Sequence, residues 1–364
     1  MKIKEVTSYL ESLAPLSSSE SYDNCGLIVG DDQEDIRQVL ISLDCVESTV
    51  DEAIEKGCNL IIAHHPIVFK GLKKFNGRNY IERTVIKAIK NNIAIYAIHT
   101  NLDNYQFGVN REIGERLGLS DLSVLAPKQN VLSKLVFFCP ADYSNQVLEV
   151  MFNAGAGAIG NYSNCSFKTK GIGTFLPGEN ANPYAGEIGS LSVEHEDRLE
   201  VLVSNHKITS VISAMKDMHP YEEVAHELIP ISNLNQTEGS GMVGTLASPI
   251  ELNAFLEKVK QTFNCGVIRH TKSTGSLIEK VAFCGGSGSF LLANAKRINA
   301  DIFITGDFKY HEFFDAEEDI VIADIGHFES EQYTSILLER ILTKKFTKFA
   351  VLVTEINTNP INYF

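Results

Sequence analysis

The sequence predicts an α/β protein, with central sheets flanked by helices, whose core is interrupted by an inserted ferredoxin-like α+β domain. In both outer parts of the chain, short apolar runs alternate with amphipathic stretches, which is typical of buried parallel strands joined by helices. The middle part has a different order, and a Ser-, Asn- and Gly-rich segment at residues 232–241 follows it. We therefore expect an α/β core of residues 1–126 and 242–364, split by a domain of residues 128–235.

The first outer segment begins with alternating charged and apolar residues over positions 1–10, which predict the start of a helix. Beyond it, apolar runs predict strands and the stretches between them predict helices, the first of which ends at Gly57. The expected strands are residues 39–43, 59–63 and 93–98, and the expected helices are residues 47–56 and 81–90.

The middle segment begins with a strand-like run that is followed by Pro140, and a glycine-rich turn comes after its first helix. The expected strands are residues 132–138, 165–175, 187–194, 199–203 and 223–229, and the expected helices are residues 145–153 and 206–217. Their order, β-α-β-β-α-β with one extra strand, is typical of a ferredoxin-like domain.

The last segment returns to alternating strands and helices. The expected strands are residues 281–283, 301–305, 319–323 and 349–354, and the expected helices are residues 290–299 and 328–345. The first of these strands enters a glycine-rich stretch at residues 284–289. This stretch could bind an anion at a helix start, but it lacks the Lys-Ser/Thr pair of a P-loop, so a tight turn explains it better.

The composition excludes several classes of protein. There are 32 basic and 46 acidic residues, which give a net charge of −14 and argue against broad binding to nucleic acid or to an anionic membrane. No run of about 18 apolar residues predicts a membrane span, and no signal peptide is expected. The seven cysteines have no paired spacing, so we expect free thiols and a cytoplasmic protein.

Three clusters of histidine and carboxylate residues each lie just beyond an expected strand, where open α/β sheets bind ligands. The clusters contain His64 and His65, then His99 and Asp103, then His327 and Glu331. His327 and Glu331 are four residues apart at a helix start, so their side chains share a face. Imidazole and carboxylate groups are the usual ligands of zinc, iron and manganese. Five ligands, namely His64, His65, Asp103, His327 and Glu331, with carboxylates that can bridge, favour two metal ions about 3.5–4 Å apart over a single ion.

Simpler explanations exist for each cluster alone. A His-His pair is often surface decoration, and a His-x-x-x-Glu spacing is often only a helical pair. His99 could orient Asp103 or take part in proton transfer, and His311, near Asp307, could contact substrate or move a proton. A capped loop with a solvated histidine would explain His99 and His311 equally well. Asn24 and Asp44 are further candidates for the edge of the pocket.

Five short motifs together resemble the NGG1-interacting-factor-3-like family, whose members are often named GTP cyclohydrolase 1 type 2 homologs. The motifs are residues 22–27, 63–66, 99–103, 305–311 and 326–331, and they span both outer segments. The resemblance implies a centre of two divalent metal ions, with zinc as the first candidate and iron or manganese as alternatives. It implies that the ligands are His64, His65, Asp103, His327 and Glu331, with Glu331 bridging. Tyr22 departs from the family pattern, because many relatives carry Trp there.

The middle segment is similar to the insert of longer bacterial members, which resembles the CutA and PII-like trimeric fold, and residues 219–224 carry this likeness. The resemblance also implies a ring-shaped homohexamer with the inserts as caps.

Two functions follow as hypotheses. One is a metal-dependent hydrolase, GTP cyclohydrolase-like or acting on another nucleotide or phosphoester. The other is a non-enzymatic metal-binding assembly or regulatory protein whose insert senses a small-molecule ligand or docks a partner. DNA binding through a ring is a weaker hypothesis, because the net charge opposes it.

Overall fold

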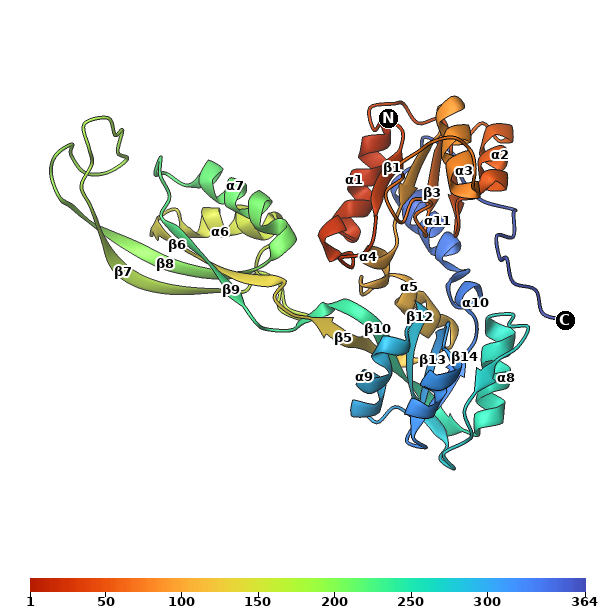
Figure 1. The fold of residues 1–364 in the computed structure, drawn as a ribbon. Helices are drawn as coiled ribbons and strands as arrows, with labels where there is room; N and C mark the ends of the chain where they lie inside the picture. Colours follow the sequence, from red (N-terminus) through yellow and green to blue (C-terminus); the bar gives the residue numbers. More distant parts are fainter. The chain divides into compact units, whose positions relative to one another are not determined.

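The structure is a computed structural model that describes all residues, 1–364. It divides into two compact units (Figure 1). Unit 1 contains Met1–Pro127 and Thr237–Phe364, and unit 2 contains Lys128–Gln236. No helix in the structure combines the length and the apolar character that crossing a membrane requires.

The first sheet of unit 1 has five strands in the order β1-β4-β3-β2-β15. All neighbours in this sheet are parallel except β1, which runs antiparallel to β4. The strands are β1 (Gly26–Val29), β2 (Val39–Ser42), β3 (Leu60–Ala63), β4 (Ala94–Ala97) and β15 (Val351–Val353). The flanking helices are α1 (Ile3–Leu13), α2 (Glu47–Glu55), α3 (Tyr80–Lys90) and α11 (Thr334–Lys345), and η1 (Leu16–Ser18) is a short 3-10 turn.

Both faces of this first sheet are covered, which explains why its central strands are apolar throughout. Val39 and Ile41 of β2 face the core that α1 and α11 share. Leu40, between them, faces the opposite core under α2 and α3. The apolar runs therefore predicted these strands well, to within about two residues at each end.

The second sheet of unit 1 has six strands in the order β11-β14-β13-β12-β10-β5. The strands β12, β13 and β14 are parallel, and β10 and β11 run antiparallel to their neighbours β12 and β14. The strands are β5 (Ser120–Lys128), β10 (Asn235–Ile250), β11 (Arg269–His270), β12 (Ile278–Ser287), β13 (Ile302–Gly306) and β14 (Val321–Asp324). The helices are α4 (Thr100–Asp103), α5 (Val109–Arg116), α8 (Leu252–Thr262), α9 (Leu292–Arg297) and α10 (His327–Glu331), with 3-10 turns η3 (Ser289–Leu291) and η4 (Tyr310–Ala316).

One buried core joins the two sheets of unit 1, because residues of β2 and β3 belong to the same apolar cluster as Phe283 of β12 and Ile304 of β13. The expectation of a single helix over residues 328–345 is wrong in detail. The chain forms α10 and α11 as separate helices, and Gln332 between them donates from its side chain to the carbonyl oxygens of Phe263 and Glu329. This break lets α10 act as a short, separately placed element beside the sheet.

Unit 2 has a four-stranded antiparallel sheet in the order β7-β8-β6-β9. Its elements are β6 (Leu132–Pro140), α6 (Ser144–Asn153), β7 (Ser166–Phe175), β8 (Ser192–Ser204), η2 (Asn205–Lys207), α7 (Ile208–Met218) and β9 (His226–Ile231). Both helices pack on one face of the sheet, where Leu135 and Leu199 meet Met151 and Met215. The two strands expected at residues 187–194 and 199–203 are in fact one, β8, since its side chains alternate continuously between the two faces.

Candidate metal centre

The two sheets of unit 1 bring the three histidine and carboxylate clusters together. His64 and His65 follow β3 directly, and their amides donate to the carbonyl oxygens of Ser42 and Leu43, so they extend the parallel ladder. Asp103 is the last residue of α4, which begins three residues after Ala97, the end of the neighbouring strand β4. His327 and Glu331 are the two ends of α10, which follows β14 of the second sheet. The cluster therefore lies at the carboxyl ends of parallel strands.

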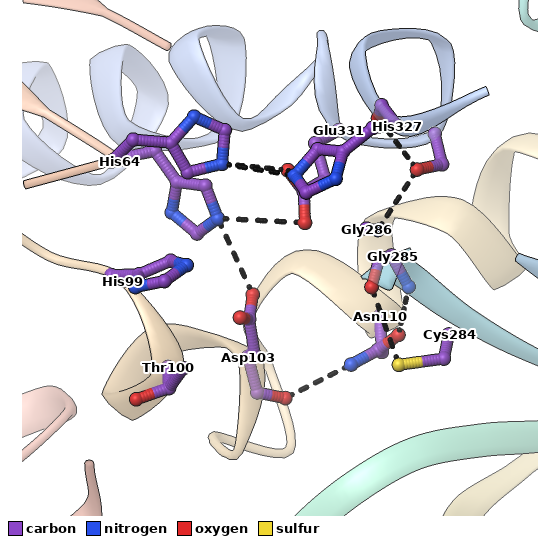
Figure 2. Close-up of polar contacts among 12 residues, drawn as sticks. His64, His99, Thr100, Asp103, Asn110, Cys284, Gly285, Gly286, His327 and Glu331 are labelled. Atoms are coloured by element: carbon purple, nitrogen blue, oxygen red, sulfur yellow. Dashed lines mark hydrogen bonds and ion pairs between the residues drawn. The ribbon is translucent and has the colours of Figure 1, made fainter. Parts of the chain in front are cut away.

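Glu331 lies at the centre of this cluster and is 2% exposed (Figure 2). Its Oε2 atom lies 3.0 Å from Nε2 of His65 and 3.1 Å from Nε2 of His327. Its Oε1 atom lies 3.8 Å from Nε2 of His64, which in turn lies 3.5 Å from Oδ1 of Asp103. The two carboxylate oxygens of Glu331 thus face two different sets of ligand atoms.

The Nε2 atom of His64 faces Oδ1 of Asp103, an oxygen that only accepts hydrogen bonds when the carboxyl group is charged. The Nδ1 atom of the same ring lies 2.8 Å from the carbonyl oxygen of Ile98. Because a carbonyl oxygen only accepts, Nδ1 carries the hydrogen, and Nε2 of the neutral ring keeps its lone pair. Nε2 of His64 and Oδ1 of Asp103 are both buried and have no hydrogen-bond partner. Two buried acceptors that face each other are costly unless a proton or a metal ion lies between them.

The other two histidines are oriented in the same way by carboxylates behind them. Nδ1 of His65 lies 2.7 Å from Oδ1 of Asp44, and Nδ1 of His327 lies 2.7 Å from Oδ2 of Asp307. Carboxylates in this position fix the ring of a metal-binding histidine and make its other nitrogen a better ligand. Asp44, expected at the edge of the pocket, and Asp307, expected to contact substrate or assist His311, both lie behind histidine rings, and Asp44 also lines the cavity beside the cluster.

The ionisable groups of the cluster shift one another strongly. Burial lowers the pKa of His65 and His327, but hydrogen bonds with carboxylates outweigh burial and raise the pKa to about 9 for His65 and about 11 for His327. Burial, followed by repulsion from Glu331, raises the pKa of Asp103 to about 7. Burial also opposes charge on Glu331, yet hydrogen bonds from the histidines, His327 foremost, hold its pKa well below the usual range. The carboxylates of the site therefore stabilise positive charge beside them, which protons or metal ions can supply.

The donor atoms fit metal ions. His65, His327 and Glu331 offer ligand atoms that all lie within 4.8 Å of one another, and so do His64, Asp103 and Glu331. Nitrogen and carboxylate oxygen in groups of three are the donors of zinc sites that keep a position open. Glu331 belongs to both groups, so the residues present could hold metal at two neighbouring places.

His99 also lies in this cluster. Its ring centre is 5.2 Å from that of His64 and 5.3 Å from that of His65. Its Nδ1 atom lies 2.9 Å from Oδ1 of Asp23, whose other oxygen accepts from the amide and the hydroxyl of Thr100. Burial raises the pKa of Asp23, but the hydrogen bonds with His99 and Thr100 outweigh burial, so the pKa is lower than usual. Asp23 lies in the motif at residues 22–27 but was not predicted as a site residue.

Two other candidates lie elsewhere. His311 packs against the rings of Tyr310 and Phe314 and is not among the residues that line the cavity beside the cluster. The side-chain amide of Asn24 donates to the carbonyl oxygen of Val68, and Asn24 does not line that cavity either.

The glycine-rich turn at residues 284–289 packs against the cluster (Figure 2). Gly286 has a φ of +62°, and a Cβ atom there would lie 2.4 Å from Oε1 of Glu331. The amide of Gly285 donates to Oδ1 of Asn110 at 3.0 Å, and the amide of Gly286 donates to Oγ of Ser330 at 2.9 Å. Nδ2 of Asn110 donates to the carbonyl oxygen of Asp103. The turn therefore makes room for the carboxylate of Glu331 and, through Asn110, connects to Asp103.

An α/β core whose strand ends gather histidines and carboxylates in two overlapping groups defines a protein with a candidate metal centre. The model of the family Duf34/NIF3 (NGG1p interacting factor 3) matches residues 1–360, and the chain belongs to this family. The resemblance found in the sequence motifs is thereby confirmed.

Relatives match over the whole chain. A Bacillus subtilis (strain 168) protein named GTP cyclohydrolase 1 type 2 homolog is 38% identical over 370 residues, which cover 99% of this chain and 98% of the relative. A Halalkalibacterium halodurans protein of the same name is 40% identical over 363 residues, 98% of each chain. The solved structure of a Bacillus cereus protein related to NIF3 has a TM-score of 0.88 at 36% identity and covers 100% of this chain and 99% of its own.

Proposed function

We propose that the chain is a hydrolase that depends on two divalent metal ions held by His64, His65, Asp103, His327 and Glu331. The observation that carries this proposal is the pair of buried acceptors, Nε2 of His64 and Oδ1 of Asp103, 3.5 Å apart and without a hydrogen-bond partner. His65 and His327 would hold one ion, His64 and Asp103 would hold the other, and Glu331 would contribute to both. Zinc is our first candidate, and iron or manganese would suit the same ligands.

The proposal of catalysis rests on the openness of one side of the site. The side chains of His65 and His327 are 22% and 33% exposed, whereas Glu331 is buried. A cavity of about 520 Å³ lies beside them and is lined by His65, His99, Asp103, His327 and Glu331, among others. Structural metal sites are closed by protein ligands, whereas catalytic sites leave a position for water or substrate.

Each group of residues has a distinct task in this proposal. When bound, the metal ions would supply activation of water at neutral pH and polarisation of the electrophilic atom of the substrate. Asp44 and Asp307 hold the rings of His65 and His327 so that Nε2 points inward. Asp23 holds Nδ1 of His99, which leaves Nε2 of His99 as the atom that could move a proton to a leaving group.

The names of the relatives suggest the reaction. Hydrolytic opening of a purine ring is what GTP cyclohydrolase implies, and hydrolysis of a phosphoester would use the same pair of ions. The test is metal analysis of the purified protein, followed by a screen of GTP and simple phosphoesters with the metal-reconstituted chain. His65→Ala and Glu331→Ala should lower both metal content and turnover, whereas His311→Ala, outside the cavity, should change neither. Turnover that survives both ligand substitutions unchanged would refute the proposal.

A second candidate, a regulatory protein that senses a ligand, draws on unit 2. This unit has its own cavity of about 530 Å³, lined by Phe175, Tyr184, Glu196 and Tyr221, among others. Such a cavity suits the sensing role that a PII- or CutA-like insert would have, within the homohexamer that the family resemblance implies. A metal content that is high in a protein without turnover on any compound of the screen would favour this candidate.

A further inference from the structure

The cavity beside the metal cluster is lined by carboxylates and contains no lysine or arginine. Its four acidic residues are Glu20, Asp44, Asp103 and Glu331. Two divalent ions would bring four positive charges, which these four carboxylates balance. The cavity with its ions would therefore have no surplus of positive charge to attract a polyanion.

Four backbone amides at or next to this cavity are already engaged in hydrogen bonds. The amides of Gly285 and Gly286, in the turn that could have bound an anion, already donate to Asn110 and Ser330. The amides of His99 and Thr100, at the start of α4, already donate to side-chain oxygens of Asn101 and Asp23. A triphosphate carries about three to four negative charges near neutral pH and is usually bound by such amides together with Lys or Arg.

Aromatic rings, in contrast, are exposed around the cavity. Tyr22 and Phe69, whose ring centres are 6.2 Å apart, are 62% and 43% exposed and belong to the part of unit 1 that contains the first sheet. Phe290, from the second sheet's side, is 64% exposed. All three line the cavity. Exposed aromatic faces beside a polar cluster favour a flat ring that can stack on them.

We propose that the substrate is a flat, uncharged heteroaromatic compound, such as a nucleobase or nucleoside, and not a nucleoside triphosphate. This inference rests on the proposed function, because it names the substrate class of the same site. The ring would stack on Tyr22, Phe69 or Phe290 next to the metal cluster. Lys70 follows Phe69 along the chain, but it is not among the residues that line the cavity.

The test compares guanosine with GTP, a pair that differs only in the triphosphate tail. Isothermal titration calorimetry of the full-length, zinc-reconstituted protein should give a dissociation constant for guanosine at least tenfold lower than for GTP. Phe290→Ala should weaken guanosine binding at least tenfold. Tyr310→Ala, which removes a ring that is 72% exposed but lies outside the cavity, should leave binding unchanged, and so should Lys70→Ala.

Two results would overturn the inference: GTP that binds as tightly as guanosine, or GTP binding that is tighter and falls in Lys70→Ala. These results leave the proposed hydrolase intact, provided that zinc-dependent turnover of GTP or a phosphoester is found. If guanosine binds as expected but no compound is turned over, the proposed hydrolase fails and the assignment of the ligand class stands.

Discussion

Replacing Gly286 by alanine tests whether the glycine-rich turn makes room for Glu331. An alanine with the positive φ of this residue costs about 1–2 kcal/mol by itself. Its Cβ atom would also lie 2.4 Å from Oε1 of Glu331, so the carboxylate must shift from its place in the cluster. We expect Gly286→Ala to lower the free energy of unfolding of the metal-free protein by about 1–3 kcal/mol. We also expect zinc affinity to fall about 10–100-fold, as when a metal ligand loses its orientation.

A second glycine provides the control. Gly275 also has a positive φ, +86°, but nothing lies within 4 Å of where its Cβ would be. Gly275→Ala should therefore lose only the backbone contribution and keep the zinc affinity of the wild type. Urea unfolding measures the first quantity, and competition with a chromophoric zinc chelator measures the second. If Gly286→Ala and Gly275→Ala bound zinc equally well, the turn would not position Glu331.

Asp44→Asn removes the carboxylate behind His65 and should lower zinc affinity about 10–100-fold in the same competition assay. Asp51→Asn, whose carboxylate pairs with Lys87 on the surface, is the matched control, and equal affinities of the two variants would contradict the role of Asp44. Raising the pH from about 6 to about 10 should destabilise the metal-free protein. Folding raises the pKa of both histidines above the value of about 6.5 that histidine has in an unfolded chain. The stability this provides is complete below about pH 6.5 and is lost as the pH rises through the folded pKa values, about 9 for His65 and about 11 for His327. Thermal melting with a chelator present should show this loss, and it should be smaller in His327→Ala; an equal loss in that variant would assign the pH dependence to other groups.

The parts of the fold that the sequence predicted best are those in which burial and periodicity agree. The strand β3 is buried along its whole length, so its apolar run is unmistakable. The long strand β10 was missed because its 16 residues contain glycines at positions 239, 241 and 244 and no continuous apolar run. These glycines lie against neighbouring backbone or side chains, which no local pattern indicates.

The candidate site was predicted as three clusters because each cluster is local in the sequence. What joins the clusters is not local. Asp23 lies 76 residues from His99 along the chain, and Asp44 lies 21 residues from His65. Asn110 links Asp103 to a glycine 175 residues further along. Partners of this kind are set by the packing of the sheets, so local sequence patterns could not predict which histidine or carboxylate each of them contacts.

The division of the site between two sheets has a consequence for how the protein matures. Asp103 and His327 are 224 positions apart in the chain, and unit 2 is encoded between them. During synthesis, His64, His65 and Asp103 exist well before α10 has been made, and they are three of the five proposed ligands. An ion can be held by the whole set only after both sheets have packed on their common core, so metal retention would report that unit 1 has finished folding.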